Sequence, residues 1–532
     1  MKRSNVENCK DNNRRYLRKS TILSVLSLLL AASVFVTACG SQGTGVEGGL
    51  SESDGSGTAD AGVSEQVKEL VVIGTWQASE AETLGNAQLS EGTDGSYIHK
   101  IEQDGDGCVF TIEIPEEGFY DLNFISASEG GHKENFVSVD GESVGSIVNE
   151  DEEFTDAVIR RIYMKTGTHK VELTKSWGWI RISALEVAES QEIDKGIYEV
   201  TAKLSNPNAS EETKRLYSYL LDIYGEKFLS GQYCDTGHNG KEFQIINKAT
   251  GKTPAVLGLD FIEYTPSRVE NGSIGHSTDF AINFWNDGGI VTFCWHWNAP
   301  SKYLTGQWYS GFYKEYTNID LAKIMNGEDT EGYDLLMKDI DAIAEQLLIL
   351  KEAKVPILWR PLHEASGGWF WWGNAGADAY KKLYILLYER LTNEYNLDNL
   401  IWVWNGQDAE WYPGDEYVDI VSEDIYPGEK VYTSQVDSFL NAANNYSTER
   451  KMVHLSENGC VFDPELAKRD GAMWGMWCTW QGEFVAKNTA IFALSEQYTE
   501  EYMLKKAYED ENVITLEDLP DLTAYEIREE LK

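Results

Sequence analysis

The segment 359–373, WRPLHEASGGWFWWG, combines the polar and aromatic side chains that a chemical site needs. It follows the apolar run 355–358, which is typical of a buried strand. Arg360, His363 and Glu364 come in quick succession and are followed by four aromatic residues. Aromatic faces stack on sugar rings, and a carboxyl group beside them does acid–base chemistry. The segment therefore indicates a carbohydrate site; the alternative is a buried Glu–Arg pair under a tryptophan-rich cluster.

Other polar residues follow similar apolar runs in the second half of the chain. His296 follows one run, Tyr426 another, and Glu457 ends a third. Two carboxyl groups on either side of a glycosidic bond are the minimum equipment of a glycosidase, so Glu364 and Glu457 are the candidate pair. The chain has no Gly-x-Ser-x-Gly elbow, and His296 and His363 lack the spacing of metal ligands with a third residue. We therefore expect no catalytic metal and no organic cofactor.

Alternating strands and helices must position these residues. Helical patterns fill most gaps between the strand candidates, and the clearest are 210–223, begun by the N-cap Ser210, 333–353 and 377–395. This alternation predicts an α/β fold, a (β/α)8 TIM barrel, in which the carboxyl ends of the strands build the active site. A doubly wound open sheet is the alternative, but no Gly-rich loop follows the first strand. The eight strand candidates are 228–233, 255–260, 290–295, 355–360, 400–404, 418–424, 452–457 and 473–478.

Residues 67–190 have a different pattern. Short alternating runs such as 108–114 and 158–164 are separated by Gly-containing turns, which predicts a small β-sandwich. Trp177 and Trp179 flank one glycine near its end. Either ring could stack on a sugar, or one of them could pack in the core.

The first 39 residues read as an export segment. A basic start is followed by the apolar stretch 21–36, which is short for a membrane span. It ends in Val-Thr-Ala-Cys-Gly, which resembles a bacterial lipobox and implies lipidation of Cys39. Residues 40–66 are rich in Gly, Ser, Asp and Glu, which predicts a flexible linker. We expect an extracellular protein that meets the membrane only through its lipid anchor.

The net charge of −42 argues against nucleic-acid binding, because phosphate contacts need clustered Lys and Arg. It is compatible with an uncharged polymer as partner, and also with solubility alone. The seven cysteines have no CxxC spacing, which makes a zinc site improbable, and sequence cannot assign any disulfide among them.

The catalytic half, about 200–528, resembles glycoside hydrolase family 26, whose members are mostly endo-β-1,4-mannanases. The segments that carry the resemblance are 229–232 (LSGQ), 295–297 (WHW), 359–364 (WRPLHE), 422–426 (SEDIY), 455–459 (LSENG) and 479–480 (TW). The resemblance implies that Glu364 is the acid/base and Glu457 the nucleophile of a retaining reaction, with carboxyl groups about 5–5.5 Å apart. It also implies substrate-binding roles for His296, Trp308, His363, Trp369, Tyr426 and Trp480.

The module at 67–190 is similar to the galactose-binding-like carbohydrate-binding modules, family 35 in particular. The matching pieces are 80–82 (EAE), 118–120 (GFY), 139–141 (VDG) and 179–182 (WIRI). Such modules often hold a structural calcium near the Glu-x-Glu segment and an Asp in the last strand. That strand here reads Ile182-Ser183-Ala184 without the Asp, so calcium is doubtful.

Together these features predict a surface-anchored, monomeric endo-β-mannanase with a binding module. Because the fold and the carboxylates do not fix the sugar, a β-glucanase or xylanase of the same family is the first alternative. A non-catalytic glycan-binding lipoprotein is the second, but both glutamates are present. A solute-binding lipoprotein is the third, and the eight-strand pattern and the paired carboxylates speak against it.

Overall fold

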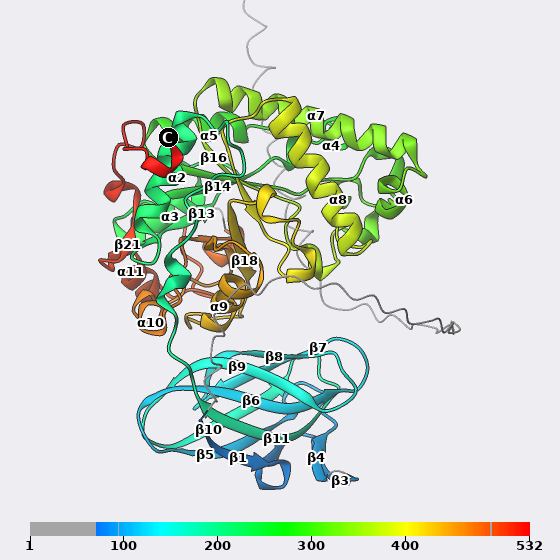
Figure 1. Ribbon diagram of the computed structural model, residues 1–532, viewed down its shortest axis with the longest axis vertical. Helices are drawn as coiled ribbons and strands as arrows, with labels where there is room; N and C mark the ends of the chain where they lie inside the picture. The colour runs from blue at the N-terminus through cyan, green and yellow to red at the C-terminus, as the bar shows by residue number, and fades with distance from the viewer. Residues whose placement is uncertain (1–70, 94, 490–491) are drawn as a thin grey trace, which may run out of the picture. The chain divides into compact units, whose positions relative to one another are not determined.

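The computed structural model describes residues 71–93, 95–489 and 492–532 (Figure 1). The predicted export segment with its lipidation site Cys39, and the predicted linker 40–66, lie outside the described residues. No helix within the described ranges is long and apolar enough to span a bilayer.

The first folded region consists of two antiparallel sheets, which confirms the predicted sandwich. One sheet has the order β3-β4-β11-β6-β9 with β1 paired to β11, and the other has the order β2-β5-β10-β7-β8. The strands are β1 (Val72–Gln77), β2 (Glu82–Leu84), β3 (Gln88–Gly92), β4 (Gly95–His99), β5 (Gly107–Ile114), β6 (Gly118–Ser128), β7 (Lys133–Val139), β8 (Glu142–Asn149), β9 (Thr155–Met164), β10 (Gly167–Lys175) and β11 (Ile180–Glu189).

Alternation along the strands explains why the sheets pack together. In β5, Phe110 and Ile112 are buried whereas Thr111 and Glu113 are exposed. A strand whose side chains alternate in this way offers one apolar face to a neighbouring sheet. The inward residues of both sheets form one hydrophobic cluster, which is the core of the region.

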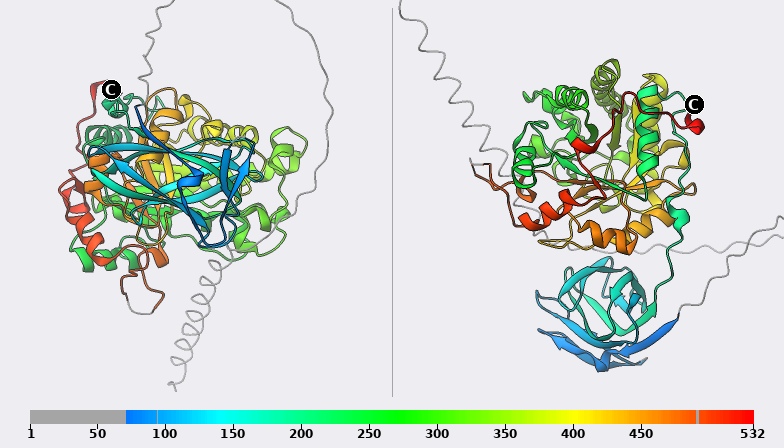
Figure 2. Two further views of the ribbon diagram at one scale, coloured as in Figure 1. Left: turned by 90° about the horizontal axis from the view of Figure 1, so that it is seen from below. Right: turned by 90° about the vertical axis from the view of Figure 1, so that its left-hand side faces the viewer.

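The second region is a closed barrel of parallel strands in sequential order, which confirms the predicted (β/α)8 fold (Figure 1 and Figure 2). Its strands consist almost entirely of buried residues, as expected where helices cover the outer face of a parallel sheet. They are β13 (Gly231–Tyr233), β14 (Val256–Asp260), β15 (Ile290–Trp295), β16 (Ile357–Pro361), β17 (Leu400–Trp404), β18 (Ile420–Ile425), β19 (Met452–Asn458) and β20 (Trp477–Thr479).

Helices lie around the outside of these strands (Figure 1 and Figure 2). Ser210 caps the first of them by accepting a hydrogen bond from the backbone N–H of Thr213, and Asp329 caps the longest in the same way. They are α2 (Glu211–Ile223), α3 (Lys241–Thr250), α4 (Pro266–Val269), α5 (Ser277–Asn286), α6 (Leu321–Met325), α7 (Thr330–Glu352), α8 (Ala377–Tyr388), α9 (Val436–Asn445), α10 (Pro464–Asp470) and α11 (Glu501–Glu509).

The structure differs from the predicted strands at the closure of the barrel. The expected strand 228–233 divides in two: β12 (Phe228–Leu229) pairs with β21 (Val513–Ile514) outside the barrel, and only β13 lies within it. The last strand begins at Trp477 instead of residue 473. The pattern of residue types along a segment does not reveal where one strand ends and pairing with a distant segment begins.

The cysteines in the described ranges are Cys108, Cys234, Cys294, Cys460 and Cys478, and all five are free and buried. None of them forms the disulfide that the sequence left open.

Candidate active site

The two glutamates singled out in the sequence meet at the carboxyl ends of the barrel strands. Glu364 follows β16, and Glu457 is the penultimate residue of β19. One carboxylate oxygen from each of Glu364, Asp424 and Glu457 lies within 4.8 Å of the others. Retaining glycosidases hold their two carboxyl groups about 5–5.5 Å apart, whereas inverting enzymes need about 6.5–9.5 Å to admit a water. The observed proximity fits the retaining geometry.

Arg360 provides the positive charge in this acidic cluster. Its guanidinium donates hydrogen bonds to Asp424 and to Oε1 of Glu457, and a further one of 3.2 Å to the hydroxyl of Tyr233. The side chains of Arg360 and Asp424 are fully buried. Three carboxylates this close could also hold a metal ion. Arg360 donates hydrogen bonds to two of them, so a guanidinium already lies where a cation shared by Asp424 and Glu457 would bind.

The two glutamates have different hydrogen-bond partners. Glu457 accepts from Arg360 and, at Oε2, from the hydroxyl of Tyr426 at 2.8 Å. Glu364 accepts one bond, of 2.9 Å, from the indole N–H of Trp369. A guanidinium and a tyrosine hydroxyl favour the ionised form of Glu457 more strongly than the single indole favours that of Glu364.

Burial, together with the negative charge of Glu457, raises the pKa of Glu364 to about 7. Burial also raises the pKa of Glu457 to about 7, although Arg360 opposes this effect. Two carboxyl groups this close titrate as a pair. When the pair holds one proton, the contact with Arg360 keeps the charge on Glu457, and the proton resides on Glu364.

The backbone around Glu364 is held in an uncommon conformation. Leu362 and Glu364 both have φ of 53°, in the left-handed region that non-glycine residues rarely adopt. Asn405, just after β17, fixes this turn because its carbonyl and its side-chain oxygen both accept from the N–H of Glu364, at 2.7 and 2.9 Å. The Asn405 amide also donates to Asp424 at 3.1 Å. Three neighbouring strand ends are thereby joined around Glu364.

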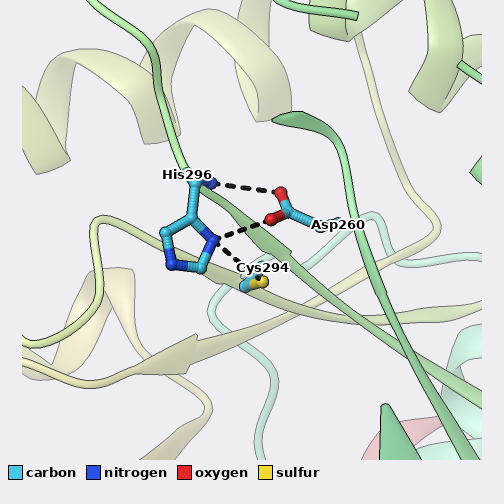
Figure 3. Close-up of side chains that lie close together, drawn as sticks. All are labelled: Asp260, Cys294 and His296. Atoms are coloured by element: carbon cyan, nitrogen blue, oxygen red, sulfur yellow. Dashed lines mark hydrogen bonds and ion pairs between the residues drawn. The ribbon is translucent and has the colours of Figure 1, made fainter. Parts of the chain in front are cut away.

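A histidine pair lies beside the glutamates. His296 Nε2 and His363 Nε2 are 3.2 Å apart, and His296 Nδ1 lies 2.7 Å from Asp260 Oδ2 (Figure 3). Asp260, Cys294 and His296 are residue types that bind metals, and one ligand atom of each lies within 4.8 Å of the others. Burial raises the pKa of the Cys294 thiol well above its ordinary value, and the imidazole is already bonded to Asp260. The donor set therefore fits a shared proton better than a metal ion.

Aromatic side chains surround the polar groups. The Trp480 ring lies 4.6 Å from that of Tyr233 and 5.7 Å from that of His296, measured between centroids. Trp369 is 41% exposed and Tyr426 is 42% exposed, so both offer an open ring face beside the glutamates. In contrast, Trp371, Trp372, Trp402 and Trp404 are fully buried and pack in the core.

Trp308 lies in a different environment. It is partly buried, and its ring lies 5.6 Å from the guanidinium carbon of Arg268 and 5.7 Å from the ring of Tyr309. These contacts do not include the glutamates or the histidine pair. Trp308 therefore has neighbours of its own. The structure brings together the other seven predicted barrel residues, which are Glu364, Glu457, His296, His363, Trp369, Tyr426 and Trp480.

The sandwich exposes both of its candidate tryptophans. Trp177 is 55% exposed and Trp179 is 46% exposed, so neither packs in the core. The buried Asn135 supports their loop, because its side-chain oxygen accepts from the N–H of Ser176 and of Gly178. The Trp177 ring makes an edge contact with His132 at 5.1 Å and keeps much of its surface free.

The doubtful calcium site of this region finds little support in its donors. Glu80 accepts from the backbone N–H of Gln77, and Ser183 donates to the carbonyl of Ile125. In the described part of the sandwich, no three acidic, His or Cys side chains bring ligand atoms within 4.8 Å of one another. Calcium takes six to eight oxygen ligands, which include backbone carbonyls as well as carboxylates, so the doubt about calcium in this region stays a prediction from the sequence.

Sequence reasoning missed two residues of the barrel site. Asp260 ends a predicted strand, and Asn405 follows another, but neither was assigned a role. The placement of both at strand ends was the available signal. Their partners, a histidine on the next strand and a backbone N–H, depend on geometry that spacing does not reveal.

Comparison with known proteins matches both regions to families. Residues 205–508 match the family described as "Glycosyl hydrolase family 26", and residues 74–190 match "Carbohydrate binding module (family 35)". The chain is 36% identical over 453 residues to a mannan endo-1,4-beta-mannosidase of Thermothelomyces thermophilus, covering 84% of this chain and 90% of that protein. It is 35% identical to mannan endo-1,4-beta-mannosidase B of Piromyces sp, covering 84% of this chain and 76% of that protein.

Solved structures agree with these matches. The GH26-CBM35 beta-(1,4)-mannanase of Podospora anserina has a TM-score of 0.59 at 34% identity, covering 85% of this chain and 99% of that one. A ruminal GH26 endo-beta-1,4-mannanase has a TM-score of 0.58 at 29% identity, covering 84% and 98%. The resemblance seen in the sequence motifs is therefore confirmed over both folded regions, and the chain belongs to glycosyl hydrolase family 26.

Proposed function

We propose that this protein is a retaining endo-β-1,4-mannanase, which cleaves mannan, glucomannan or galactomannan through a covalent glycosyl-enzyme. The observation that carries the proposal is the pair Glu364 and Glu457, which bring one carboxylate oxygen each to within 4.8 Å of the other and are bonded to different partners. The curated relatives that match 84% of this chain at 35–36% identity are named mannan endo-1,4-beta-mannosidases, so a β-glucanase or xylanase is not favoured. The presence of both glutamates speaks against a non-catalytic barrel.

In the first step, a carboxylate oxygen of Glu457 attacks the anomeric carbon. The bond between that carbon and the glycosidic oxygen breaks, and Glu364 gives its proton to the departing oxygen. The raised pKa of Glu364, about 7, keeps that proton available near neutral pH. The product is a glycosyl ester of Glu457 and a shortened chain.

In the second step, Glu364, now ionised, takes a proton from a water molecule. That water attacks the anomeric carbon and releases Glu457 as a carboxylate, with net retention of configuration. Both glutamates return to their starting protonation states, so the cycle balances without an external acid or base. We propose that no metal or organic cofactor takes part.

Other side chains have positioning and binding roles in this proposal. Arg360 and Tyr426 hold Glu457 ionised and fix its orientation through the hydrogen bonds described above. Trp369 both bonds Glu364 and offers a ring face to a sugar next to the cleaved bond. We assign further sugar contacts to His296, His363 and Trp480, and a more distant one to Trp308.

The test is reducing-sugar release by the full-length protein on four polysaccharides: glucomannan, galactomannan, mixed-linkage β-glucan and xylan. The proposal expects release from both mannans, products of mixed length, and little release from the others. Activity confined to β-glucan or xylan would overturn the substrate and keep the chemistry. No release from any of the four would overturn the enzymatic assignment.

We further propose that the protein is a secreted, lipid-anchored monomer on the outer face of a bacterial membrane. The basic start, the apolar stretch and the lipobox-like Cys39 support this localisation. In this arrangement the sandwich binds mannan-type polysaccharide and keeps it near the barrel. Replacement Cys39→Ala should move the protein out of the membrane fraction, and unchanged fractionation would refute the anchor.

A further inference from the structure

Three neighbouring barrel strands end in a chain of hydrogen bonds. Asp260 is the last residue of β14, His296 follows β15, and His363 follows β16. Asp260 Oδ2 lies 2.7 Å from His296 Nδ1, and His296 Nε2 lies 3.2 Å from His363 Nε2. The side chains of His296 and Asp260 are only 13% and 9% exposed. Water therefore competes little for these bonds.

The carboxylate of Asp260 can face the imidazole in only one way. Its Oδ1 accepts from the backbone N–H of Ile262 at 2.8 Å and of His296 at 3.1 Å. Oδ2 is the oxygen left for the ring (Figure 3). An ionised carboxylate only accepts hydrogen bonds, so His296 Nδ1 carries a proton and Nε2 is directed at His363.

On the basis of the proposed glycosidase function, we propose that Asp260 is a positioning residue of the active site. It fixes the Nδ1–H form of His296, and through it the hydrogen bond between His296 and His363 beside the two glutamates. Asp260 acts on the reaction only through the imidazole. Neither the family matches nor the predicted site assigns it a role.

The same contact controls the charge of His296. Burial lowers the pKa of His296, but the charge of Asp260 and its hydrogen bond, together with the charges of Glu457 and Glu364, raise the pKa above the ordinary 6.5. Burial, Arg360 and His296 lower the pKa of His363, so His363 stays neutral. The charged groups that raise the pKa of His296 are Asp260, Glu457 and Glu364, and two neutral groups, the Cys294 thiol and His363, face the same ring. The charged and titratable groups that act on the two glutamates are Arg360, Asp424, His296 and Tyr426.

A protonated His296 favours the ionised nucleophile. The positive charge of His296 lowers the pKa of Glu457 and of Glu364, in addition to the larger effect of Arg360. Within the ion pair of Asp260 and His296, the imidazolium has the larger effect on the pKa of the two glutamates. The acid limb of activity, where Glu457 takes up a proton, should therefore depend on Asp260.

Replacement Asp260→Asn reverses the hydrogen bond without removing the side chain. The amide oxygen must take the place of Oδ1, because the backbone donors of Ile262 and His296 point there. The amide NH2 then faces His296 Nδ1, which has to become an acceptor, so the ring proton moves to Nε2. An imidazolium would place two donors face to face, and His296 becomes neutral.

The first experiment measures kcat/KM against pH for the full-length protein, Asp260→Asn and Cys294→Ala, with mannohexaose as substrate. Without the imidazolium the pKa of Glu457 rises, so the acid limb of Asp260→Asn should move up by about 0.5–1 pH unit. Cys294→Ala is the matched control, because its buried Sγ lies 3.9 Å from the same Nδ1 but carries no charge, since burial raises the pKa of the thiol well above its ordinary value. The acid limb of the Cys294→Ala profile should stay at the same pH as that of the unsubstituted protein. A slower Asp260→Asn enzyme with an unshifted limb would show a merely structural role and overturn the proposal.

The second experiment does not depend on hydrolysis. In protein labelled with 15N-histidine, the His296 ring, identified by its loss in His296→Ala, should appear as an Nδ1–H species that titrates above pH 6.5. In Asp260→Asn it should appear as the Nε2–H form and titrate at lower pH. An unchanged tautomer and titration in Asp260→Asn would refute the inference. If the unsubstituted protein hydrolyses no mannan, the proposed function fails, and this measurement still decides the role of Asp260.

Discussion

Two glutamates with the same side chain take opposite roles in this site because of the groups that contact them. Glu457 is bonded to a buried guanidinium and a tyrosine hydroxyl, whereas Glu364 is bonded to one indole N–H. The negative charge of Glu457 in turn contributes to the raised pKa of Glu364. The division of labour is therefore mutual: the nucleophile, while ionised, keeps the acid protonated.

This coupling can be measured in Glu457→Gln. The variant should have no turnover, since the nucleophile is lost, and the pKa of Glu364 should fall below about 7 because a neighbouring negative charge is removed. It should stay above the ordinary 4.5, since burial, the larger cause, remains. The carboxyl 13C chemical shift of Glu364 followed against pH gives the value. A pKa that rises or stays fixed would contradict the coupling.

Arg360 should matter for stability as well as for catalysis. Arg360→Met leaves Asp424 and Glu457 buried without their cation, and breaking such a pair costs about 3–5 kcal/mol of unfolding free energy. Without Arg360 the pKa of both carboxyl groups rises, so they take up protons in the folded state. The loss should thus be smaller at about pH 5 than at about pH 8.

Urea unfolding at both pH values checks this expectation. Arg528→Met is the matched control, because Arg528 and Asp222 form an ion pair with 36% and 42% of their side chains exposed. Exposed pairs contribute little, at most about 1 kcal/mol. Equal losses in the two variants, or a larger loss for Arg360→Met at acid pH, would contradict the account.

At the scale of elements, the ends of β16, β17 and β18 are joined by Asn405. It accepts twice from the N–H of Glu364 and donates to Asp424, so it maintains the left-handed turn that carries Glu364. Asn405→Ala should lower kcat by about tenfold to a hundredfold, since loss of one or two such bonds costs about 1.5–3 kcal/mol. Hydrolysis of a soluble manno-oligosaccharide, with the melting temperature measured alongside, tests this prediction.

Asn399 offers a control on the adjoining part of the chain. It directly precedes β17, is buried, and donates to the carbonyl of Val355. Asn399→Ala should lower the melting temperature with little change in kcat. If both variants lose activity in proportion to their stability, Asn405 is only a structural residue.

The elements also show how far the sequence could be interpreted. The alternation of apolar strands with helices predicted the barrel. The positions of Glu364, Glu457, His296 and His363 at strand ends predicted that they belong to the active site, because the carboxyl ends of the parallel strands lie at one end of a barrel. The division of 228–233 between two pairings could not be predicted, since its partner β21 lies far along the chain. The roles of Asp260 and Asn405 depend on bond directions, which residue spacing does not contain.

At the scale of the whole molecule, we expect the sandwich to hold insoluble substrate for the barrel. Trp177→Ala removes the most exposed ring of its tryptophan loop and should weaken retention on insoluble mannan by up to about tenfold, since ring stacking contributes about 0.5–1.5 kcal/mol. Hydrolysis of mannohexaose should be unchanged. A pull-down on insoluble mannan measures retention, and Leu89→Ala, also exposed on the sandwich, is the control. Equal retention of all three proteins would contradict a role of Trp177.

The central claim is the covalent route through Glu457, and trapping the intermediate tests it most directly. A 2-deoxy-2-fluoro-β-mannobioside with a dinitrophenyl leaving group slows the second step and leaves the sugar on the nucleophile. The account predicts a mass increase of one disaccharide and a peptide labelled at Glu457. A label on another residue would move the nucleophile, and turnover with inverted anomeric configuration and no label would contradict the retaining mechanism.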